Sequence, residues 1–173
     1  MAIFSYQSKP LSSRVSSISK RAGILAGTVA LATLITGCQT MVAVEAAEDA
    51  ASPLCANMMV LLPEVIGDVE KRPTSSQATA AWGEPTEVVL RCGVEVPGPT
   101  TDPCVSVNGV DWIAREGENG VWTLTTYGRN PATEVLLDPQ VIPSSTVIAS
   151  LSDAASKIPA ERECVSYEKS VDI

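Results

Sequence analysis

Four cysteines in the second part of this chain constrain its fold more than any other feature. They are well separated in the 173-residue sequence: Cys55, Cys92, Cys104 and Cys164. An even number of separated cysteines is typical of a domain that disulfides staple in an oxidising compartment. Four cysteines allow three pairings. Cys92 and Cys104 bracket a loop rich in proline, which favours a bond between them and leaves Cys55 to pair with Cys164.

The composition argues against a metal site and against the common catalytic centres. The sequence contains no histidine and no CxxC spacing, which excludes the usual mixed zinc sites, Ser-His-Asp triads and Cys-His pairs. It also lacks the signature loops that bind nucleotides or calcium. We therefore expect no metal, no cofactor and no catalytic residue that the sequence alone can identify.

The beginning of the chain has the pattern of an export signal. Residues 22–37 are uncharged and mostly apolar, and they follow a segment that contains Arg14, Lys20 and Arg21. A basic segment, an apolar segment of this length and small residues before a cleavage point are typical of a secretory signal peptide. We therefore interpret residues 1–37 as a signal peptide.

A fifth cysteine, Cys38, directly follows this signal. The three residues before it, Ile-Thr-Gly, resemble the lipobox of bacterial lipoproteins, in which the cysteine sulfur receives a diacylglyceryl group. This resemblance predicts lipidation of Cys38 and a location at the outer face of the cytoplasmic membrane. Two alternatives stay open: an uncleaved single-pass anchor, because about 20 apolar residues can span a bilayer, and free secretion after a later cleavage.

The charge of the remaining chain excludes some partners. Four of the 12 Lys and Arg precede Cys38 and none of the 20 Asp and Glu does, which leaves 8 basic and 20 acidic residues, a net charge of −12. Such a surface repels phosphate backbones, so we expect no nucleic-acid partner. It also repels anionic lipid headgroups, so attachment to the membrane must come from a lipid or from an apolar helix. The expected partner is an unknown envelope protein or cell-wall component.

Hydrophobic periodicity predicts two helices in a domain at residues 53–173. Residues 38–52 are rich in alanine and lack turn residues, which indicates a flexible tether. A helix that begins at Pro53 and stops before Pro63 fits the apolar spacing that follows. A second helix, capped by Ser144 or Ser145, should bury one stripe: Val147, Ile148, Leu151, Ala154 and Ile158.

Strand patterns occupy the middle of this domain. The dipeptide Asn108-Gly109 favours a two-residue hairpin turn that pairs Val107 with Val110 and Val105 with Trp112. A four-residue loop, "GENG", would then place Trp112 opposite Thr125. We predict an α+β fold with a small antiparallel meander sheet of about four to five strands, two helices and disulfide staples.

Five residues are candidates for ligand binding. Asp111 and Glu84 each lie close in sequence to a tryptophan, Trp112 and Trp82, that could stack on a sugar. The competing interpretation makes both tryptophans core residues. Arg129, beside a tyrosine and a glycine, could bind a carboxylate or phosphate in bidentate fashion, or could pair with Asp111.

The order of several motifs is similar to that of a known family. These are "LCANMMVLLPEVIG", "AAWGEPTEVVLRCGVEVP", "NGVDWI" and "YGRNP", and the similarity covers Cys55 to about Ile158. They resemble an actinobacterial family of exported proteins known as domain of unknown function 3515. The resemblance implies an exported or membrane-anchored envelope protein of unknown activity, and it supplies no catalytic residues.

The expected function is therefore a non-catalytic binding or scaffolding module at the cell wall. One alternative is a wall-acting enzyme that uses paired carboxylates, for which Asp111 and Glu84 are the candidates. The other is a small solute-binding accessory protein, for which a domain of about 120 residues is short.

Overall fold

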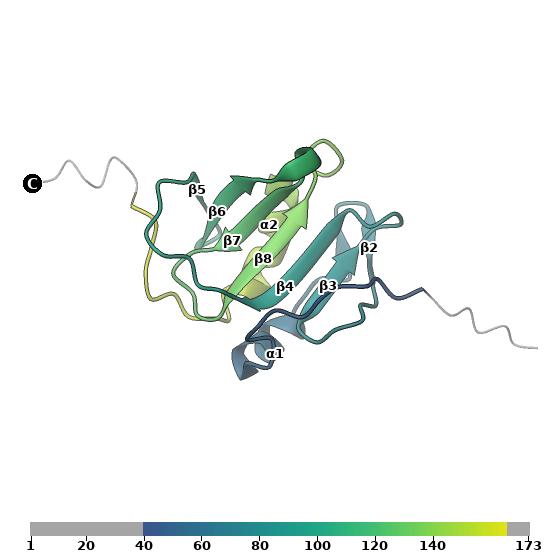
Figure 1. Cartoon of the computed structure of the whole chain (residues 1–173), viewed down its shortest axis with the longest axis horizontal. Helices are drawn as coiled ribbons and strands as arrows, with labels where there is room; N and C mark the ends of the chain where they lie inside the picture. The colour runs from purple at the N-terminus through teal and green to yellow at the C-terminus, as the bar shows by residue number, and fades with distance from the viewer. Residues whose placement is uncertain (1–39, 166–173) are drawn as a thin grey trace, which may run out of the picture. The chain divides into compact units, whose positions relative to one another are not determined.

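The computed structural model describes residues 40–165, which form one antiparallel sheet of eight strands and two helices (Figure 1). Along the sheet the strands lie in the order β1 (Val65–Ile66), β2 (Val69–Arg72), β3 (Thr79–Trp82), β4 (Val88–Val94), β8 (Ala132–Leu137), β7 (Trp122–Thr126), β6 (Val110–Glu116) and β5 (Cys104–Val107). The helices are α1 (Pro53–Met59) and α2 (Ser144–Ala155), and a 3₁₀ turn, η1 (Glu118–Gly120), joins β6 to β7. No helix within residues 40–165 is long and apolar enough to cross a membrane.

The predicted α+β fold with four to five strands is wrong, because the molecule is mostly β with eight strands. Among the missed strands are the two short ones at one edge: β1 has only two residues, and three of the four residues of β2 are charged. Short, charged strands are common at sheet edges, where they discourage pairing with other chains. They lack the alternating apolar pattern that marks a half-buried strand.

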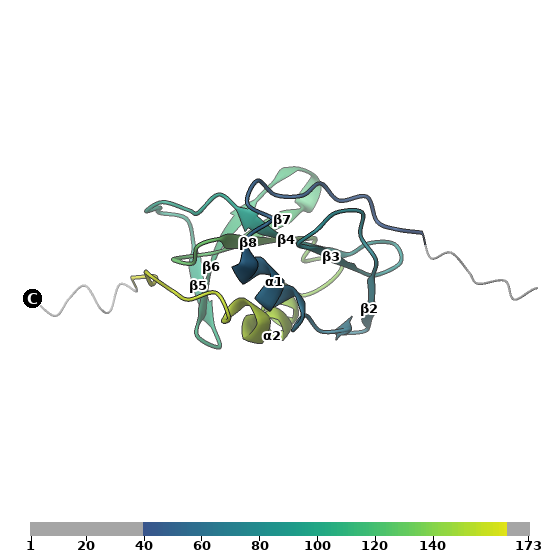
Figure 2. The same cartoon turned by 90° about the horizontal axis from the view of Figure 1, so that it is seen from below.

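Both helices cover the same face of the sheet (Figure 2). All five residues of the stripe predicted for the second helix are buried in the core, but the helix ends at Ala155, so Ile158 lies beyond it. The N-cap position of α2 is Pro143, so Ser144 and Ser145 lie inside the helix and not at its cap. Two fully buried tryptophans, Trp82 and Trp112, supply the large side chains of a core whose other members are mainly aliphatic.

The hairpin register predicted from Asn108-Gly109 is confirmed, but the next register is wrong by one residue. Trp112 lies opposite Thr126 and not Thr125, because the loop after β6 has five residues and includes η1. A shift of one residue moves every side chain to the other face of a strand. Leu124 therefore packs in the core, while Thr125 lies across from Ile113 on the face that the helices do not cover.

All four domain cysteines form disulfides, but the expected pairing is wrong. Cys55 binds Cys92 and Cys104 binds Cys164, with Cα atoms 5.7 Å and 6.3 Å apart. The expectation assumed that the strands on either side of the proline-rich loop are neighbours in a meander. Instead β8, β7 and β6 lie between β4 and β5, so Cys92 and Cys104 are well separated in the sheet.

The segment expected to be a tether is hydrogen-bonded to the domain from Thr40 onward. Val42 forms an isolated bridge with Thr74, and the Asp49 amide donates to the carbonyl of Gly93 over 2.9 Å. Val44 and Ala50 are buried. This segment crosses the face of the sheet opposite the helices (Figures 1 and 2). Cys38 and the predicted signal peptide lie outside the described residues.

Candidate functional site

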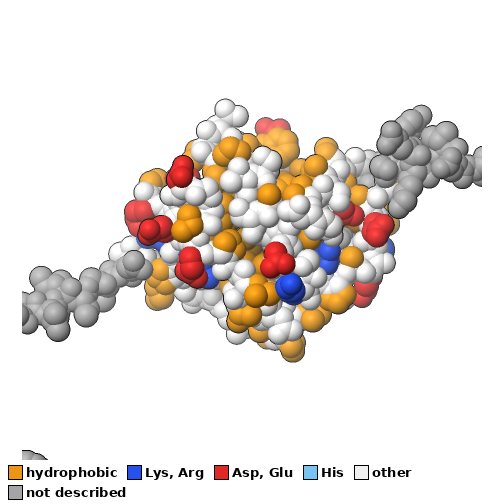
Figure 3. All heavy atoms as spheres, turned by 180° about the vertical axis from the view of Figure 1, so that it is seen from behind, with side chains coloured by type: hydrophobic (Ala, Val, Ile, Leu, Met, Phe, Trp, Pro, Cys, Tyr) orange, Lys and Arg blue, Asp and Glu red, His pale blue; other side chains and the backbone are white. Residues whose placement is uncertain are grey.

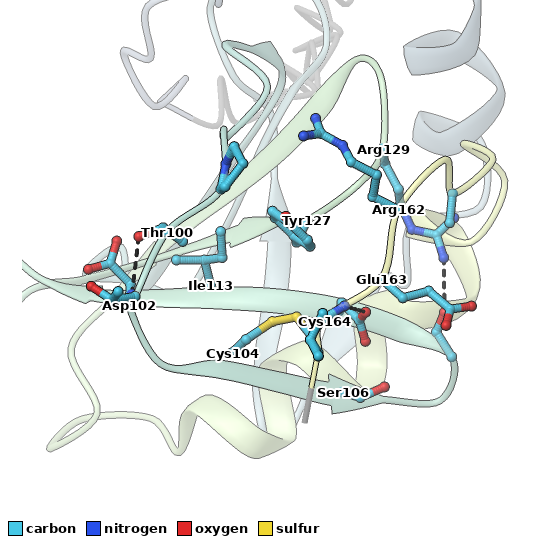
Figure 4. A pocket seen from close by; sticks show the side chains of 16 residues that line it. Thr100, Asp102, Cys104, Ser106, Ile113, Tyr127, Arg129, Arg162, Glu163 and Cys164 are labelled. Carbon is cyan, nitrogen blue, oxygen red and sulfur yellow. Dashed lines mark hydrogen bonds between the residues drawn. A yellow bond between two sulfur atoms is a disulfide. The ribbon is translucent and has the colours of Figure 1, made fainter. Parts of the chain in front are cut away.

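A cavity of about 1280 Å³ lies at the β5 end of the sheet, on the face that the helices leave open. Its floor includes Asp111 and Ile113 of β6 and Tyr127, which follows β7. One wall is the loop at residues 99–102, and the other is the C-terminal strap, defined here as residues 159–165 (Figure 4). We call this cavity the groove.

Four interactions fix the C-terminal strap beside the groove. The Cys104–Cys164 disulfide ties it to the edge strand β5, and the amide of Cys164 donates to Asp111 Oδ2 over 2.7 Å. Arg129 and Ala160 form a β-bridge, and the amide of Glu161 donates to the carbonyl of Gly128 over 2.6 Å. These contacts hold the strap as one wall of the groove.

Gly128 permits this close approach. Its φ is +71°, in the left-handed region that glycine adopts without strain. A Cβ atom at this position would also collide with the backbone of Arg162. Both the conformation and the space therefore require glycine where the strap crosses the chain that leads from β7.

Arg129 is a buried cation at one end of the groove. Its side chain is 5% exposed; Nη2 donates to the carbonyl of Gly109 over 2.9 Å and Nη1 to the carbonyl of Ile158. Within residues 40–165 its Nε has no hydrogen-bond partner. Burial lowers the pKa of the guanidinium, and the charge of Asp111 partly opposes this. Arg129 thus joins the hairpin turn of β5 and β6 to the segment that follows α2.

Arg162 and Tyr127 form a second feature of the groove. The guanidinium carbon of Arg162 lies 5.7 Å from the centre of the Tyr127 ring, within the range of a cation–π contact. Arg162 belongs to the strap and is exposed, whereas Tyr127 is half-buried. The two side chains meet although they are distant in sequence.

The structure brings together two of the five predicted ligand-binding residues. Asp111 and Arg129 both line the groove, but they do not form an ion pair within 4 Å. Glu84 lines a different cavity of about 510 Å³ near β2 and pairs with Arg72 over 2.7 Å. The two carboxylates considered for catalysis therefore lie in separate cavities.

The two predicted tryptophans line neither of these cavities, because both side chains are fully buried. Trp82 Nε1 donates to the carbonyl of Pro63 over 3.0 Å, which satisfies its only polar atom. Trp112 faces the helices, and its Nε1 has no partner within residues 40–165. This placement matches the core interpretation of both side chains.

Sequence reasoning missed Arg162 as a lining residue of the groove. It lies in a tail that carries no helix or strand pattern, so nothing local marks it. The available signal was Cys164, two residues away, since a cysteine that forms a disulfide must bring its neighbours against the domain. No group of three or more acidic or cysteine side chains within residues 40–165 is arranged to hold a metal ion.

Comparison with known proteins gives a family but no activity. A family model described as protein of unknown function (DUF3515) matches residues 22–163. No curated protein and no solved structure matches the chain.

Proposed function

Because this chain belongs to the DUF3515 family, whose members have no known function, we propose a role from its own residues. The protein is an envelope lipoprotein, anchored through Cys38 at the outer face of the cytoplasmic membrane, and its groove binds another envelope component without catalysis. The single observation that carries this proposal is the groove itself, a large open cavity whose wall is held in place by a disulfide.

The anchor is supported by the signal pattern before Cys38 and by two disulfides that need an oxidising compartment. Arg72 supports a short connection between anchor and domain. Its Nη2 donates to the carbonyl and hydroxyl oxygens of Thr40 over 3.1 Å and 3.2 Å. Thr40 is two residues from Cys38, and two extended residues span at most about 7 Å. A lipid on Cys38 would therefore hold the β2 end of the sheet close to the membrane.

The groove would then face away from the membrane. It lies at β5, and six strand-to-strand steps separate β2 from β5 in the sheet. At about 4.8 Å a step, this corresponds to roughly 29 Å. A module anchored at one edge and open at the other suits a component of the wall or the outer part of another membrane protein.

The residues of the groove favour binding over catalysis. Three carboxylates line it: Asp102 pairs with Arg115 over 2.6 Å, Asp111 accepts the amide of Cys164, and Glu163 belongs to the strap. Glycoside cleavage needs two carboxylates that flank the same bond. The second carboxylate considered for glycoside cleavage, Glu84, lies in the other cavity.

Photo-crosslinking in cells tests the binding role. A photoreactive amino acid replaces Thr101 or Ser106, two exposed residues of the groove, and in the control it replaces Asp153, an exposed residue of α2. We expect a specific adduct from the groove positions and none from Asp153. No adduct from either groove position, with the protein present in the membrane, would refute the proposed binding site.

A Cys38→Ala variant tests the anchor separately. We expect the wild-type protein to incorporate labelled fatty acid and to fractionate with membranes, and the variant to lose the label. A variant that keeps both label and membrane association would contradict lipidation at Cys38. A wild-type protein that stays in the membrane without label would favour the uncleaved anchor.

A further inference from the structure

Most basic side chains of the domain are in ion pairs, and the exceptions lie together in the groove. Residues 40–165 contain seven Lys and Arg. Five of them form ion pairs with acidic side chains: Lys71, Arg72, Arg91, Arg115 and Lys157. The two that form no ion pair with a described residue are Arg129 and Arg162, and both line the groove. In an acidic domain, carboxylates are abundant, so two cations without such a partner in one cavity indicate a complementary ligand.

The rest of the surface does not offer the same feature. Acidic side chains are spread over the face that carries the helices, with few basic ones between them (Figure 3). The cavity near β2 is lined by acidic residues and by Lys71 and Arg72, which are both in ion pairs. An anion would therefore meet repulsion at most sites other than the groove.

Arg129 contributes a positive charge beneath the groove. Backbone carbonyls hold two of its nitrogens, and its Nε has no partner within the described residues. Carbonyl groups solvate a guanidinium but do not neutralise it, and a charge acts over a longer range where water is excluded. Asp111 offsets part of this charge, and one of its oxygens is already used by the amide of Cys164.

Arg162 supplies an accessible guanidinium in a fixed place. Its backbone is held where the strap crosses Gly128, its side chain lies over the Tyr127 ring, and Cys164 is bonded to β5 two residues later. A side chain that is already positioned loses less conformational entropy on binding. The planar guanidinium fits the two oxygens of a carboxylate or phosphate.

We propose that the groove binds a singly charged oxyanion group of its envelope ligand, with Arg162 as the contacting residue and Arg129 as the buried charge that supports it. This proposal takes its setting from the proposed function. Asp111 and Glu163 also line the groove. The charge of Asp111 opposes a second negative charge on the ligand, so a carboxylate or phosphodiester is favoured over a dianionic phosphate.

The test uses the full chain in detergent with ¹⁵N-labelled arginine, and follows the Nε–Hε resonances by NMR. Sodium acetate and sodium dimethyl phosphate are titrated at constant ionic strength, with chloride as the balancing anion and inorganic phosphate as the dianionic comparison. We expect saturable shifts of the Arg162 and Arg129 resonances with at least one of the two monoanions. Arg72 and Arg91, whose ion pairs lie outside the groove, should not shift.

Matched variants assign the effect. Arg162→Ala should weaken the binding of the monoanion about tenfold or more, as expected for the loss of a charged hydrogen bond. Lys157→Ala removes one positive charge outside the groove, just after the end of α2, and should leave the affinity unchanged. Replacing both Cys104 and Cys164 by Ser should also weaken binding, because the strap no longer holds Arg162. The dispersed Arg129 resonance reports whether each variant is folded.

Two outcomes would overturn the inference: no saturable shift with either monoanion, or an Arg162→Ala variant that binds as well as the wild type. Tighter binding of dianionic phosphate than of either monoanion would refute the preference for a single charge. Which monoanion binds identifies carboxylate or phosphodiester as the group. Failure here is distinct from failure of the proposed function, since crosslinking at Thr101 or Ser106 detects a bound partner of any charge.

Discussion

The two ends of the domain share one arrangement, a chain segment that crosses a glycine beside a disulfide, but the arrangement has a different role at each end. At each end a chain segment lies on a glycine with positive φ: residues 42–50 on Gly93 (φ +99°) and the C-terminal strap on Gly128 (φ +71°). At each end a disulfide is close to the crossing. It joins Cys55 to Cys92 at the first end and Cys104 to Cys164 at the second.

The ends differ in what they bury. Cys55 and Cys92 are completely buried, and the segment beside them places Val44 and Ala50 against the sheet. At the other end Cys104 is exposed, and so are most residues of the strap. The first end is therefore part of the core, whereas the second forms a polar wall of the groove. The comparison teaches that disulfides of similar span can serve stability in one place and the shape of a site in another.

Removal of the buried disulfide should have the largest effect. Replacing Cys55 and Cys92 by Ala opens a link with a sequence separation of 37 residues, for which loop-closure entropy predicts a loss of about 3.8 kcal/mol. Two cavities in the core add to this loss. We expect the full chain to lose about 4 kcal/mol or more in guanidinium denaturation, or not to fold. A loss below about 2 kcal/mol would show that this end is not part of the cooperative core.

Gly93→Ala should disrupt the packing of residues 42–50 on the sheet without removing a disulfide. The new Cβ would meet the backbone of Asp49 and Ala50, and alanine at this φ is strained by about 1–2 kcal/mol. With the displaced segment, we expect a total loss of about 2–4 kcal/mol. Gly98→Ala is the control, because nothing lies within 4 Å of its Cβ and its φ is not positive. Equal stability of the two variants would contradict the close packing at Gly93.

Removal of the Cys104–Cys164 disulfide should destabilise the fold less than removal of the buried one, although loop-closure entropy alone assigns it the larger stabilisation. The separation of 60 residues between Cys104 and Cys164 corresponds to about 4.3 kcal/mol. That figure assumes that the folded state gains no conformational freedom when the disulfide is removed. Because most of the strap is exposed, it can detach once the disulfide is removed, and the folded state then recovers conformational entropy. We expect the Cys104→Ala, Cys164→Ala variant to lose only about 1–2 kcal/mol, with fast hydrogen exchange at the amides of positions 161 and 164. A loss above that of the buried pair would reverse the comparison.

Local features of the sequence predicted one part of this fold well. Asn108-Gly109 determines the β5–β6 register through its turn geometry, and the stripe of α2 follows from helical periodicity. The β4–β8 pairing joins residues that are more than forty positions apart, for example Arg91 and Glu134. No local propensity encodes such a pairing, and the disulfide connectivity depends on it.

The residues of the candidate site also fall into two groups: those that local sequence patterns predict and those whose position depends on distant contacts. Arg129 and Asp111 were identified because they follow or belong to strands with clear patterns. Arg162 was not, because its position depends on the disulfide of Cys164 and on the space at Gly128. In the sequence, Gly128 was only a weak indication that another segment crosses there, because many turns contain glycine. Knowledge of the correct cysteine pairs would have placed the strap, and with it Arg162, beside β5.

The smallest expected effect is a dependence on pH that is confined to the groove. Hydrogen bonding with Thr100, and then with Arg115, lowers the pKa of Asp102 in the loop that faces the strap. A carboxyl whose pKa is lower in the folded state stabilises the fold above its unfolded pKa, near 3.9, and this contribution is lost as the pH falls through the folded value. Below about pH 4 we therefore expect the protection factor of the amide of Asp102, which donates to Thr100 Oγ1 over 3.1 Å, to fall while that of Asp49 at the other end does not change. Asp102→Asn should show the lower protection factor at this position throughout this range. Simultaneous loosening of both ends in the wild type would mean that the groove wall unfolds only with the core, and the distinction between the two ends would then disappear.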